Sequence, residues 1–330
     1  MATITKTEWI WKEGEFIHWE DARIHLLSTA VQFGTSVFEG IRCYGTPDGP
    51  AIFRLQDHLR RLHDSCRIYR LETAWGPEQL AEVCCEIVRK NALEACYIRP
   101  MILRGYGAAG IDAIGSPVEA YVAAWPWGTY LGAGALENGV DACVTSWQRA
   151  APNTFPMMAK AAGQYLNSQL MKWEAQRNGY HEAIAVGPTG LLSEGTGNNL
   201  FLVRKGVLIT PEIDGTILAG ITAETILTLA RDLGIPTSVQ QVPREMLYGA
   251  DELFFTGTAA EVTPIRSVDR LPVGDGARGP ITRVLQERYL GTAKGTLPDA
   301  HGWLTHARGA PGADRSGARA ERVVASRTSG

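Results

Sequence analysis

The stretch from Pro126 to Asn138 is rich in glycine and aromatic residues, a composition typical of a connection between domains. It separates two segments, and in each of them short apolar runs alternate with amphipathic patterns and polar turns. Two domains also fit the length, because 330 residues is about twice a typical domain of roughly 150. The sequence therefore predicts a small α/β domain at 1–125, an interdomain loop at 126–138 and a larger domain at 139–307.

Both segments contain patterns for strands and helices. In the first, we expect a hairpin at 9–19, strands at 41–44, 51–53, 95–103 and 120–125, and helices at 55–69 and 76–91. In the second, we expect strands at 139–147, 182–186, 197–203, 207–209 and 252–255, helices at 161–178 and 222–233, and a turn-rich segment at 256–263. On the 161–178 helix, Leu166, Leu170 and Trp173 share one side.

Charge and apolar content exclude several classes of protein. No apolar run approaches the roughly 18 residues of a membrane-spanning helix, and the first ten residues lack a signal-peptide core, so we expect a cytoplasmic protein. The net charge is −3, and since the segment 308–330 carries +3, residues 1–307 carry −6. An acidic body gives no footing for nucleic acid or an anionic membrane.

The end of the chain and the cysteines complete this outline. The segment 308–330 has little to bury and is expected to be a disordered tail, with an interaction arm as the alternative. The six cysteines have no CxxC pair or repeating spacing, which predicts free thiols and no structural metal.

Lys160 differs from the other lysines because its surroundings are apolar. No other charged side chain occurs between Arg149 and Lys172. An ammonium in such a setting loses hydration, which favours the neutral amine that can act as a nucleophile or proton carrier. A lysine that extends from an apolar surface into water is the alternative interpretation.

Glu194 is the second unusual residue. It lies in a glycine-rich segment after two leucines, where a carboxylate is either part of an exposed turn or a partner for a cationic ring nitrogen.

Two segments could bind phosphate through backbone amides. At 217–222 a Gly and a Thr stand where a helix begins, so that free N–H groups and the positive end of the helix dipole meet. At 254–261 a predicted strand runs into small residues with two hydroxyls. Arg61 could add a guanidinium fork, although a helix-surface arginine or an ordinary cap would explain the same residues.

Together these residues form the set needed to bind pyridoxal 5′-phosphate (PLP), and at this point the chain resembles the bacterial branched-chain amino acid aminotransferases, class IV of the PLP enzymes. The motifs that carry the resemblance lie at 33–42, 58–65 (HLRRLHDS), 97–100 (YIRP), 146–153 (SWQRAAPN), 159–168 (AKAAGQYLNS), 193–201 (SEGTGNNLF), 218–222 (LAGIT) and 257–269 (GTAAEVTPIRSVD). They span about residues 8–306. The resemblance implies the fold of PLP fold type IV, an α+β or α/β two-domain architecture with a small α/β sandwich domain and a larger barrel-like α/β domain.

The resemblance also implies roles for individual residues. Lys160 is similar to the lysine that forms the Schiff base with PLP and then moves the α-proton as general base. Glu194 resembles the partner of the pyridine nitrogen, and Tyr165 resembles the tyrosine at the phenolic oxygen. The remaining cofactor contacts that it implies are Arg61, Leu218, Gly220, Ile221, Thr222, Gly257 and Thr258.

For the substrate, the resemblance implies one cleft that accepts both a hydrophobic amino acid and glutamate. Arg99 is assigned to the distal carboxylate of glutamate, because an unpaired charge is costly to bury. Tyr97 and the amides of Thr258 and Ala259 resemble the contacts of the α-carboxylate, and the pocket walls implied are Phe38, Gly40, Trp127 and Tyr130. Trp127 and Tyr130 fall in the predicted interdomain loop, which could close over substrate.

The expected reaction is transfer of an amino group between L-leucine, L-isoleucine or L-valine and 2-oxoglutarate. In this family the neighbouring subunit contributes to each pocket, so a homodimer or higher homo-oligomer is implied. The alternatives are another class IV activity, namely a D-amino acid or (R)-amine transaminase or an aminodeoxychorismate-type lyase, and a non-catalytic scaffold. Phe33 stands where relatives often carry tyrosine, which puts the breadth of substrate acceptance in question.

Overall fold

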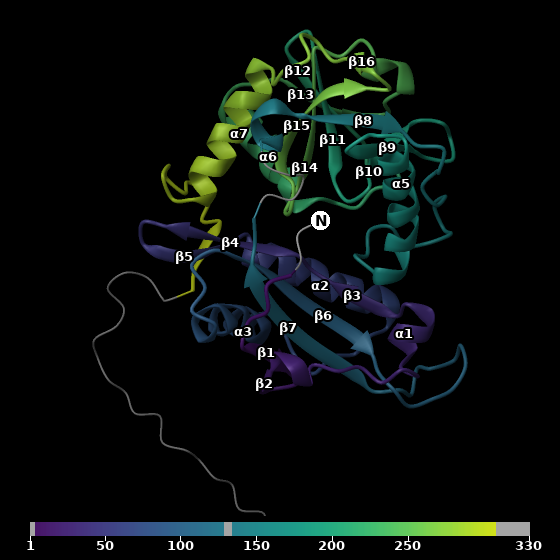
Figure 1. Ribbon diagram of the computed structural model, residues 1–330, viewed down its shortest axis with the longest axis vertical. Helices are drawn as coiled ribbons and strands as arrows, with labels where there is room; N and C mark the ends of the chain where they lie inside the picture. Colours follow the sequence, from purple (N-terminus) through teal and green to yellow (C-terminus); the bar gives the residue numbers. More distant parts are fainter. Residues whose placement is uncertain (1–3, 129–133, 308–330) are drawn as a thin grey trace, which may run out of the picture.

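The structure is a computed structural model that describes residues 4–128 and 134–307. The predicted tail at 308–330 and part of the predicted interdomain loop, including Tyr130, lie outside the described residues. The described strands form an eight-stranded and a nine-stranded sheet (Figure 1). The chain builds most of the first sheet before Pro126 and the second sheet after Gly139.

The first sheet is antiparallel in all its pairings and has the strand order β17-β5-β4-β6-β7-β1-β2, with β3 paired to β6. Its strands are β1 (Trp9–Lys12), β2 (Glu15–His18), β3 (Ser36–Phe38), β4 (Ile41–Thr46), β5 (Gly49–Phe53), β6 (Cys96–Arg104), β7 (Val118–Pro126) and β17 (Leu304–His306). The predicted hairpin is confirmed, since β1 and β2 pair across the turn at Glu13 and Gly14. Strand β17 comes from the end of the described chain and pairs with β5 of the first sheet. The predicted division placed residues 139–307 in the second domain and did not include this pairing.

Helices α2 (Leu55–Tyr69) and α3 (Pro77–Lys90) cover one face of the first sheet, and a short helix α1 (Thr29–Phe33) precedes β3. Both predicted helices are confirmed, because apolar residues three and four apart form one face in each. Leu59 and Leu62 of α2 and Ile87 of α3 are fully buried against Ile98 and Val122 of the sheet. This core fixes the positions of the strands of the first sheet that carry predicted site residues, β3 and β6.

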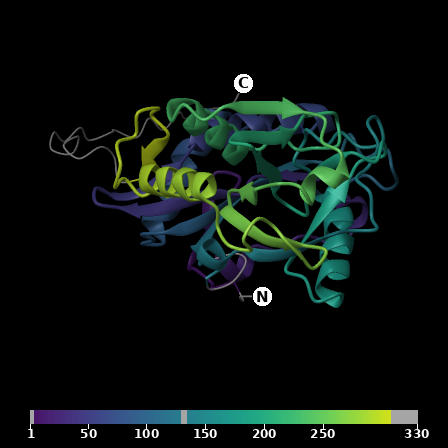
Figure 2. The ribbon, with the colours of Figure 1, turned by 90° about the horizontal axis from the view of Figure 1, so that it is seen from above.

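The second sheet is mixed, with order β10-β9-β8-β15-β14-β11-β12-β13, and β16 pairs with β15. Its strands are β8 (Val140–Val144), β9 (Glu182–Val186), β10 (Leu192–Gly195), β11 (Asn199–Arg204), β12 (Val207–Pro211), β13 (Thr237–Gln240), β14 (Glu252–Gly257), β15 (Glu261–Val268) and β16 (Leu271–Pro272). Its helices are α4 (Ala135–Asn138), α5 (Tyr165–Arg177), α6 (Ile221–Asp232) and α7 (Pro280–Ala293). Helix α5 packs against β9 and helix α7 packs against β14 and β15, so the two helices lie far apart on this sheet (Figure 1, Figure 2).

Two expectations for the second segment are wrong in detail. Most of the turn-rich segment at 256–263 is strand, because Glu261 begins β15, which continues through Pro264 between β14 and β8. Leu166, Leu170 and Trp173 share one side of the 161–178 helix as expected, but that side faces outward, with Leu166 65% and Trp173 55% exposed, while Met171 and Ala175 are buried. A 3₁₀ turn also precedes α5, so the α-helix begins at Tyr165.

The two sheets are joined by a shared core and by a buried hydrogen bond. Tyr44 and Phe53 of the first sheet pack with Phe254 of the second sheet and with Tyr289 of α7. The Tyr44 hydroxyl donates to Glu261 Oε1 over 2.9 Å.

Other features of the described residues bear on chemistry. Among the described helices, none has the length and hydrophobicity of a membrane-spanning segment. All six cysteines are free thiols and five of them are buried. In the same residues, no group of His, Cys, Asp or Glu is arranged to hold a metal ion.

Candidate active site

A cavity of about 470 Å³ lies between the two sheets, within the usual range of roughly 300–1,000 Å³ for small-molecule sites. Every site residue predicted from the sequence lines it except Tyr130, which lies outside the described residues. From the first sheet and α2 come Phe38, Gly40, Arg61, Tyr97 and Arg99, and Trp127 follows β7. From the rest of the chain come Lys160, Tyr165, Glu194, Leu218, Gly220, Ile221, Thr222, Gly257, Thr258 and Ala259.

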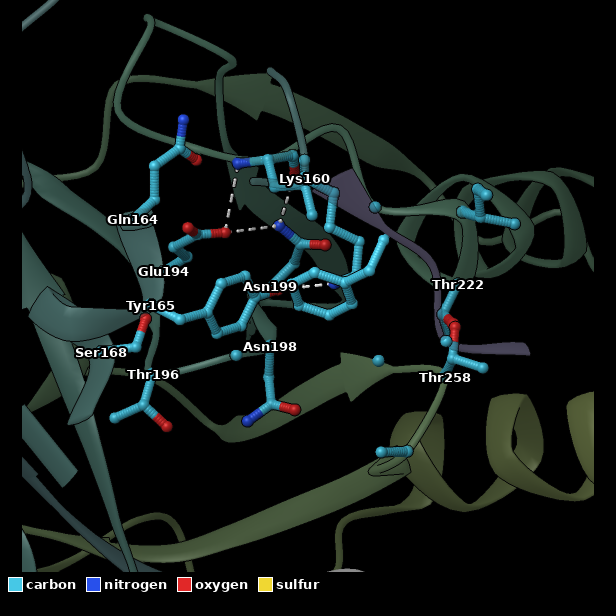
Figure 3. Close-up of a pocket in the computed structure, with 18 of the residues that line it drawn as sticks. Lys160, Gln164, Tyr165, Ser168, Glu194, Thr196, Asn198, Asn199, Thr222 and Thr258 are labelled. Carbon is cyan, nitrogen blue, oxygen red and sulfur yellow. Dashed lines mark hydrogen bonds between the residues drawn. The ribbon is translucent and has the colours of Figure 1, made fainter. Parts of the chain in front are cut away.

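Lys160 enters the cavity from a loop that is held on the first sheet. Its backbone N–H donates to Ser65 Oγ of α2 over 3.0 Å, and its carbonyl accepts from the Phe38 N–H over 3.0 Å. Its Nζ is 2.5 Å from Tyr165 Oη, to which it donates (Figure 3). The Nζ also lies 5.1 Å from the centre of the Phe38 ring. The amine is therefore directed into the cavity by both halves of the chain.

Glu194 lies on β10 and is buried, so the exposed-turn interpretation of this residue is wrong. Its Oε2 accepts from Asn199 Nδ2 over 3.2 Å and from the Leu218 N–H over 3.3 Å (Figure 3). Its Oε1 is 3.2 Å from Arg149 Nη2. Burial raises the pKa of this carboxyl, and the Arg149 cation opposes that rise. The carboxyl is thus a fixed acceptor facing the cavity.

The far end of the cavity is suited to a phosphate. Helix α6 begins there with Ile221 and Thr222, and the helix N-terminus presents free N–H groups and a positive dipole. Thr258, in the turn between β14 and β15, faces Thr222 across the same space (Figure 3). A Cβ on Gly220 would lie 1.7 Å from Asn199 Oδ1, so only glycine fits before α6.

Arg61 adds a fixed positive charge beside this cradle, and it is not a free surface arginine. Its Nε and Nη2 donate to the two oxygens of Glu39 over 2.6 and 2.8 Å, and Nη1 donates to the Ala219 carbonyl over 2.6 Å. Each terminal nitrogen carries a second N–H. Arg61 can therefore bind an anion while Glu39 fixes its orientation.

Glu39 itself is fully buried and has a second partner. Burial would raise the pKa of its carboxyl, but Arg61 and His58 lower it well below its ordinary range. Burial also lowers the pKa of His58, so the neutral ring donates from Nδ1 to Glu39 over 2.7 Å. The group is an ionised carboxylate held by an arginine and an imidazole.

The opposite wall combines aromatic rings with a cation. The Arg99 guanidinium carbon lies 4.6 Å from the centre of the Phe38 ring and 5.5 Å from that of Tyr97. Its Nε is buried without a hydrogen-bond partner among the described residues. A Cβ on Gly40 would lie 1.7 Å from Tyr97 Oη, so glycine leaves room for that hydroxyl. The aromatic rings of this wall can accept an apolar side chain, and Arg99 can accept a carboxylate.

Several residues at or beside the cavity escaped the sequence analysis, among them Glu39, Arg149 and Thr256. Glu39 and Arg149 stand within the quoted motifs but were not singled out, although a charge in an apolar run signals a buried group that needs a partner. Thr256 Oγ1 also lines the cavity, buried and without a hydrogen-bond partner in the described part of the chain. No local pattern distinguishes such a threonine from an ordinary strand residue.

The family follows from comparison with known proteins: residues 36–268 match the model of amino-transferase class IV, and the chain belongs to this family. It is 50% identical to the branched-chain-amino-acid aminotransferase of Escherichia coli (strain K12) over 92% of this chain and 98% of that protein. Among solved structures, the E. coli branched-chain amino acid aminotransferase has a TM-score of 0.90 at 49% identity, covering 92% of this chain and 100% of that one. The branched-chain amino acid aminotransferase from Thermobaculum terrenum, solved in its PLP form, has a TM-score of 0.85 at 37% identity, covering 91% of this chain and 98% of that one. The expected fold class is thereby confirmed.

Proposed function

We propose that this chain is a PLP-dependent aminotransferase that moves the amino group between L-leucine, L-isoleucine or L-valine and 2-oxoglutarate. The observation that carries the proposal is the arrangement of the half-buried Lys160 and Tyr165 and the buried Glu194 in one cavity with an anion cradle at its end. The names of the relatives of high identity support the same activity.

The residues of the cavity fit PLP at each of its functional groups. Lys160 would hold the aldehyde carbon, Tyr165 the phenolic oxygen and Glu194 the ring nitrogen. Arg61, the start of α6 and Thr258 would hold the phosphate. When bound, PLP supplies an electron sink that stabilises the negative charge left by the departing α-proton.

The protein's own groups would position the substrate and move the proton. Lys160 Nζ would accept the α-proton and return a proton during the second half of the reaction, and its hydrogen bond to Tyr165 keeps the amine at one place between these steps. Glu194 would keep a positive charge on the ring nitrogen by offering a buried carboxylate. Tyr97 and the amides of Thr258 and Ala259 would hold the α-carboxylate.

Substrate selection would depend on the wall around Arg99. Phe38, Tyr97 and Trp127 offer apolar surface to a branched side chain. Arg99 would pair with the distal carboxylate of glutamate, which this wall would otherwise leave unpaired. Tyr130 of the predicted interdomain loop would complete the pocket.

Lys160→Ala tests the reaction itself. We expect the variant to fold but to lose turnover by many orders of magnitude, because both nucleophile and proton carrier are gone. Borohydride reduction followed by peptide mapping should attach the cofactor to Lys160 in the wild-type protein and nowhere in the variant. Full activity of the variant, or wild-type protein that stays colourless with added PLP, would contradict the assignment.

Arg99→Ala tests the dual specificity. We expect kcat/KM for glutamate and 2-oxoglutarate to fall by about 100-fold, since about 3 kcal/mol is typical for losing a buried charge partner, and leucine to lose much less. Half-reactions with L-leucine, L-glutamate, D-alanine and (R)-1-phenylethylamine measure this and also test the other class IV activities. Equal losses for leucine and glutamate would refute the role of Arg99.

A homodimer is part of the proposal, supported by exposed apolar side chains beside the cavity. One group of these side chains lies around α1 and in the loops that follow, and the other lies on α5 and in the segment before it. The two groups meet at Gly34 and Gly163, where the backbones are so close that a Cβ on Gly34 would lie 3.2 Å from the Gly163 Cα. The members of this apolar surface are Leu26, Leu27, Val31, Phe33, Tyr106, Ile111, Ile114, Trp147, Phe155, Met158, Leu166, Leu170 and Trp173. Large apolar side chains exposed on neighbouring segments are typical of interaction sites.

Sedimentation of two matched variants tests the dimer. Val31, 54% exposed, lies in the apolar surface, whereas Ile213, 53% exposed, lies outside it. We expect Val31→Glu to shift the protein towards monomer and Ile213→Glu to leave the dimer intact. A wild-type monomer, or equal effects of both substitutions, would overturn this part of the proposal. The domain division at 126–138 and the cytoplasmic location stay predictions.

A further inference from the structure

Arg149 is a buried cation for which the proposed reaction has no role so far. It follows β8, where its backbone N–H donates to the Val186 carbonyl over 3.0 Å, and the residue is only 5% exposed. A guanidinium in such a place requires acceptors for its N–H groups. The groups that accept these hydrogen bonds indicate the role of Arg149.

The Arg149 guanidinium lies between β10 and α5. On one side Nη2 is 3.2 Å from Glu194 Oε1 and donates to the Gly195 carbonyl over 2.6 Å. On the other side Nη1 donates to Ser168 Oγ over 3.0 Å and to Asn167 Oδ1 over 3.3 Å. One side chain therefore ties the strand that carries Glu194 to the helix that begins with Tyr165.

Among the described residues, the other charged groups near Glu194 either form no ion pair with it or are already paired. Lys160 and Arg61 add weaker attractions to its carboxylate, after Arg149 and the Leu218 N–H. Glu182, the buried carboxyl on the neighbouring strand β9, is paired with Lys172 Nζ at 3.0 Å and accepts from Thr196. Arg149 is therefore the cation in direct contact with Glu194.

We infer that Arg149 is a positioning residue for the cofactor ring, one that keeps Glu194 a carboxylate and holds it at a set distance from Tyr165. The inference rests on the proposed binding of PLP. A buried carboxyl without a cation beside it gains a proton more readily, and a neutral Glu194 could no longer offset the charge of a protonated ring nitrogen. Loss of the Arg149 charge should therefore weaken PLP binding in a pH-dependent way.

The test is titration of the apoprotein with PLP from mildly acidic to mildly alkaline pH, followed by cofactor absorbance. For Arg149→Met we expect the dissociation constant of PLP to rise about tenfold near neutral pH. The acid limb, meaning the fall in PLP affinity on the acidic side of the pH profile, should move up by about one pH unit, since one pKa unit is tenfold in ionisation. Arg149→Lys keeps the charge and should restore the wild-type pH dependence. Asn167→Ala removes one of the two hydrogen bonds of Arg149 to α5 without touching its charge, and it should leave the acid limb in place.

A second background separates the effect on Glu194 from a general structural defect. In Glu194→Gln protein there is no carboxylate to protonate, so Arg149→Met should cause no further shift of the acid limb. The inference is overturned if folded Arg149→Met protein keeps the wild-type pH dependence, or if its shift persists in the Glu194→Gln background. Should Arg149→Met fail to fold, a shifted acid limb in Arg149→Lys overturns it instead. Wild-type apoprotein that does not bind PLP would contradict the proposed function and not this inference alone.

Discussion

Glu39 is ionised in a place that water does not reach, and two neighbours make this possible. Arg61 and His58 take up both oxygens of its carboxylate. Removing one partner of a buried charge leaves the other uncompensated. Glu39 thus links the stability of the fold to the orientation of the arginine beside the proposed phosphate site.

Glu39→Gln should destabilise the protein by about 3 kcal/mol at neutral pH, the typical effect of breaking a buried ion pair. The pKa of Glu39 is lowered in the folded protein, so its contribution is present above its ordinary value of 4.5 and is lost as the pH falls below it. Urea unfolding at several pH values should therefore show a shallower acid-side fall in stability for the variant than for wild type. Glu20→Gln, at an exposed ion pair with Lys6, is the control and should change little.

Individual site residues were predictable to very different degrees. Lys160 was singled out because it is the one charge in a long uncharged segment, and that setting is local. Glu194 on its own pointed to a turn, and its burial became visible only when Leu218 and Asn199, which follow it in the chain, were placed around it. The roles assigned to these residues stay predictions until variants are measured.

Helix α6 shows how an element's end creates a site. Gly220 is its N-cap, and the helix begins at Ile221 beside the cavity. The absence of a side chain at Gly220 lets the Asn199 amide lie against the backbone, where Nδ2 also donates to Glu194. The helix terminus and the carboxylate are in this way held by one asparagine.

Gly220→Ala should disturb both the N-terminus of α6 and the position of the Glu194 carboxylate. A Cβ would overlap Asn199 Oδ1 at 1.7 Å, and overpacking of this kind costs about 1–3 kcal/mol. We expect PLP affinity, measured by equilibrium titration of the apoprotein, to fall by about tenfold. Gly115→Ala is the matched control, because a Cβ there meets nothing within 4 Å. Equal affinity of the two variants would contradict this account of the cradle.

At the level of elements, the helices α2 and α3 were predicted within a residue or two because their apolar periodicity and their burial agree. For α5 the two disagree: the apolar side with Leu166 and Trp173 is exposed in this chain, while the small residue Ala175 faces the sheet. Strand β15 was missed because Pro264 and the preceding small residues resemble a turn. Its pairing with β14 and β8 overrides that local preference.

The whole molecule depends on contacts between the two sheets. Tyr44 comes from β4 and Glu261 from β15, and Arg42 Nη2 lies 3.4 Å from the same carboxylate oxygen. This contact is next to the turn that carries Thr258. The joint between the sheets, formed by Tyr44, Arg42 and Glu261, is therefore adjacent in the chain to one wall of the proposed phosphate site.

Tyr44→Phe should weaken this joint while leaving the ring packing intact. Loss of a buried hydrogen bond to a charged group costs about 1.5–3 kcal/mol, which predicts a decrease of several degrees in Tm. Calorimetry should still show one transition if the sheets unfold together. A variant as stable as wild type, or separate transitions for wild type, would show that this contact does not couple the sheets.

Most helices and strands, the family resemblance and the candidate reactive groups could be predicted from the amino-acid sequence alone. Those properties are local, since periodicity, charge setting and motif can be read within a few neighbouring residues. Three features could be found only from contacts between distant segments: β17 returns to the first sheet, the apolar side of α5 is exposed, and Glu39 and Arg149 each hold a side chain of the cavity. These depend on side chains distant in the chain, and the free energy of burying a charge is set by which of them meet.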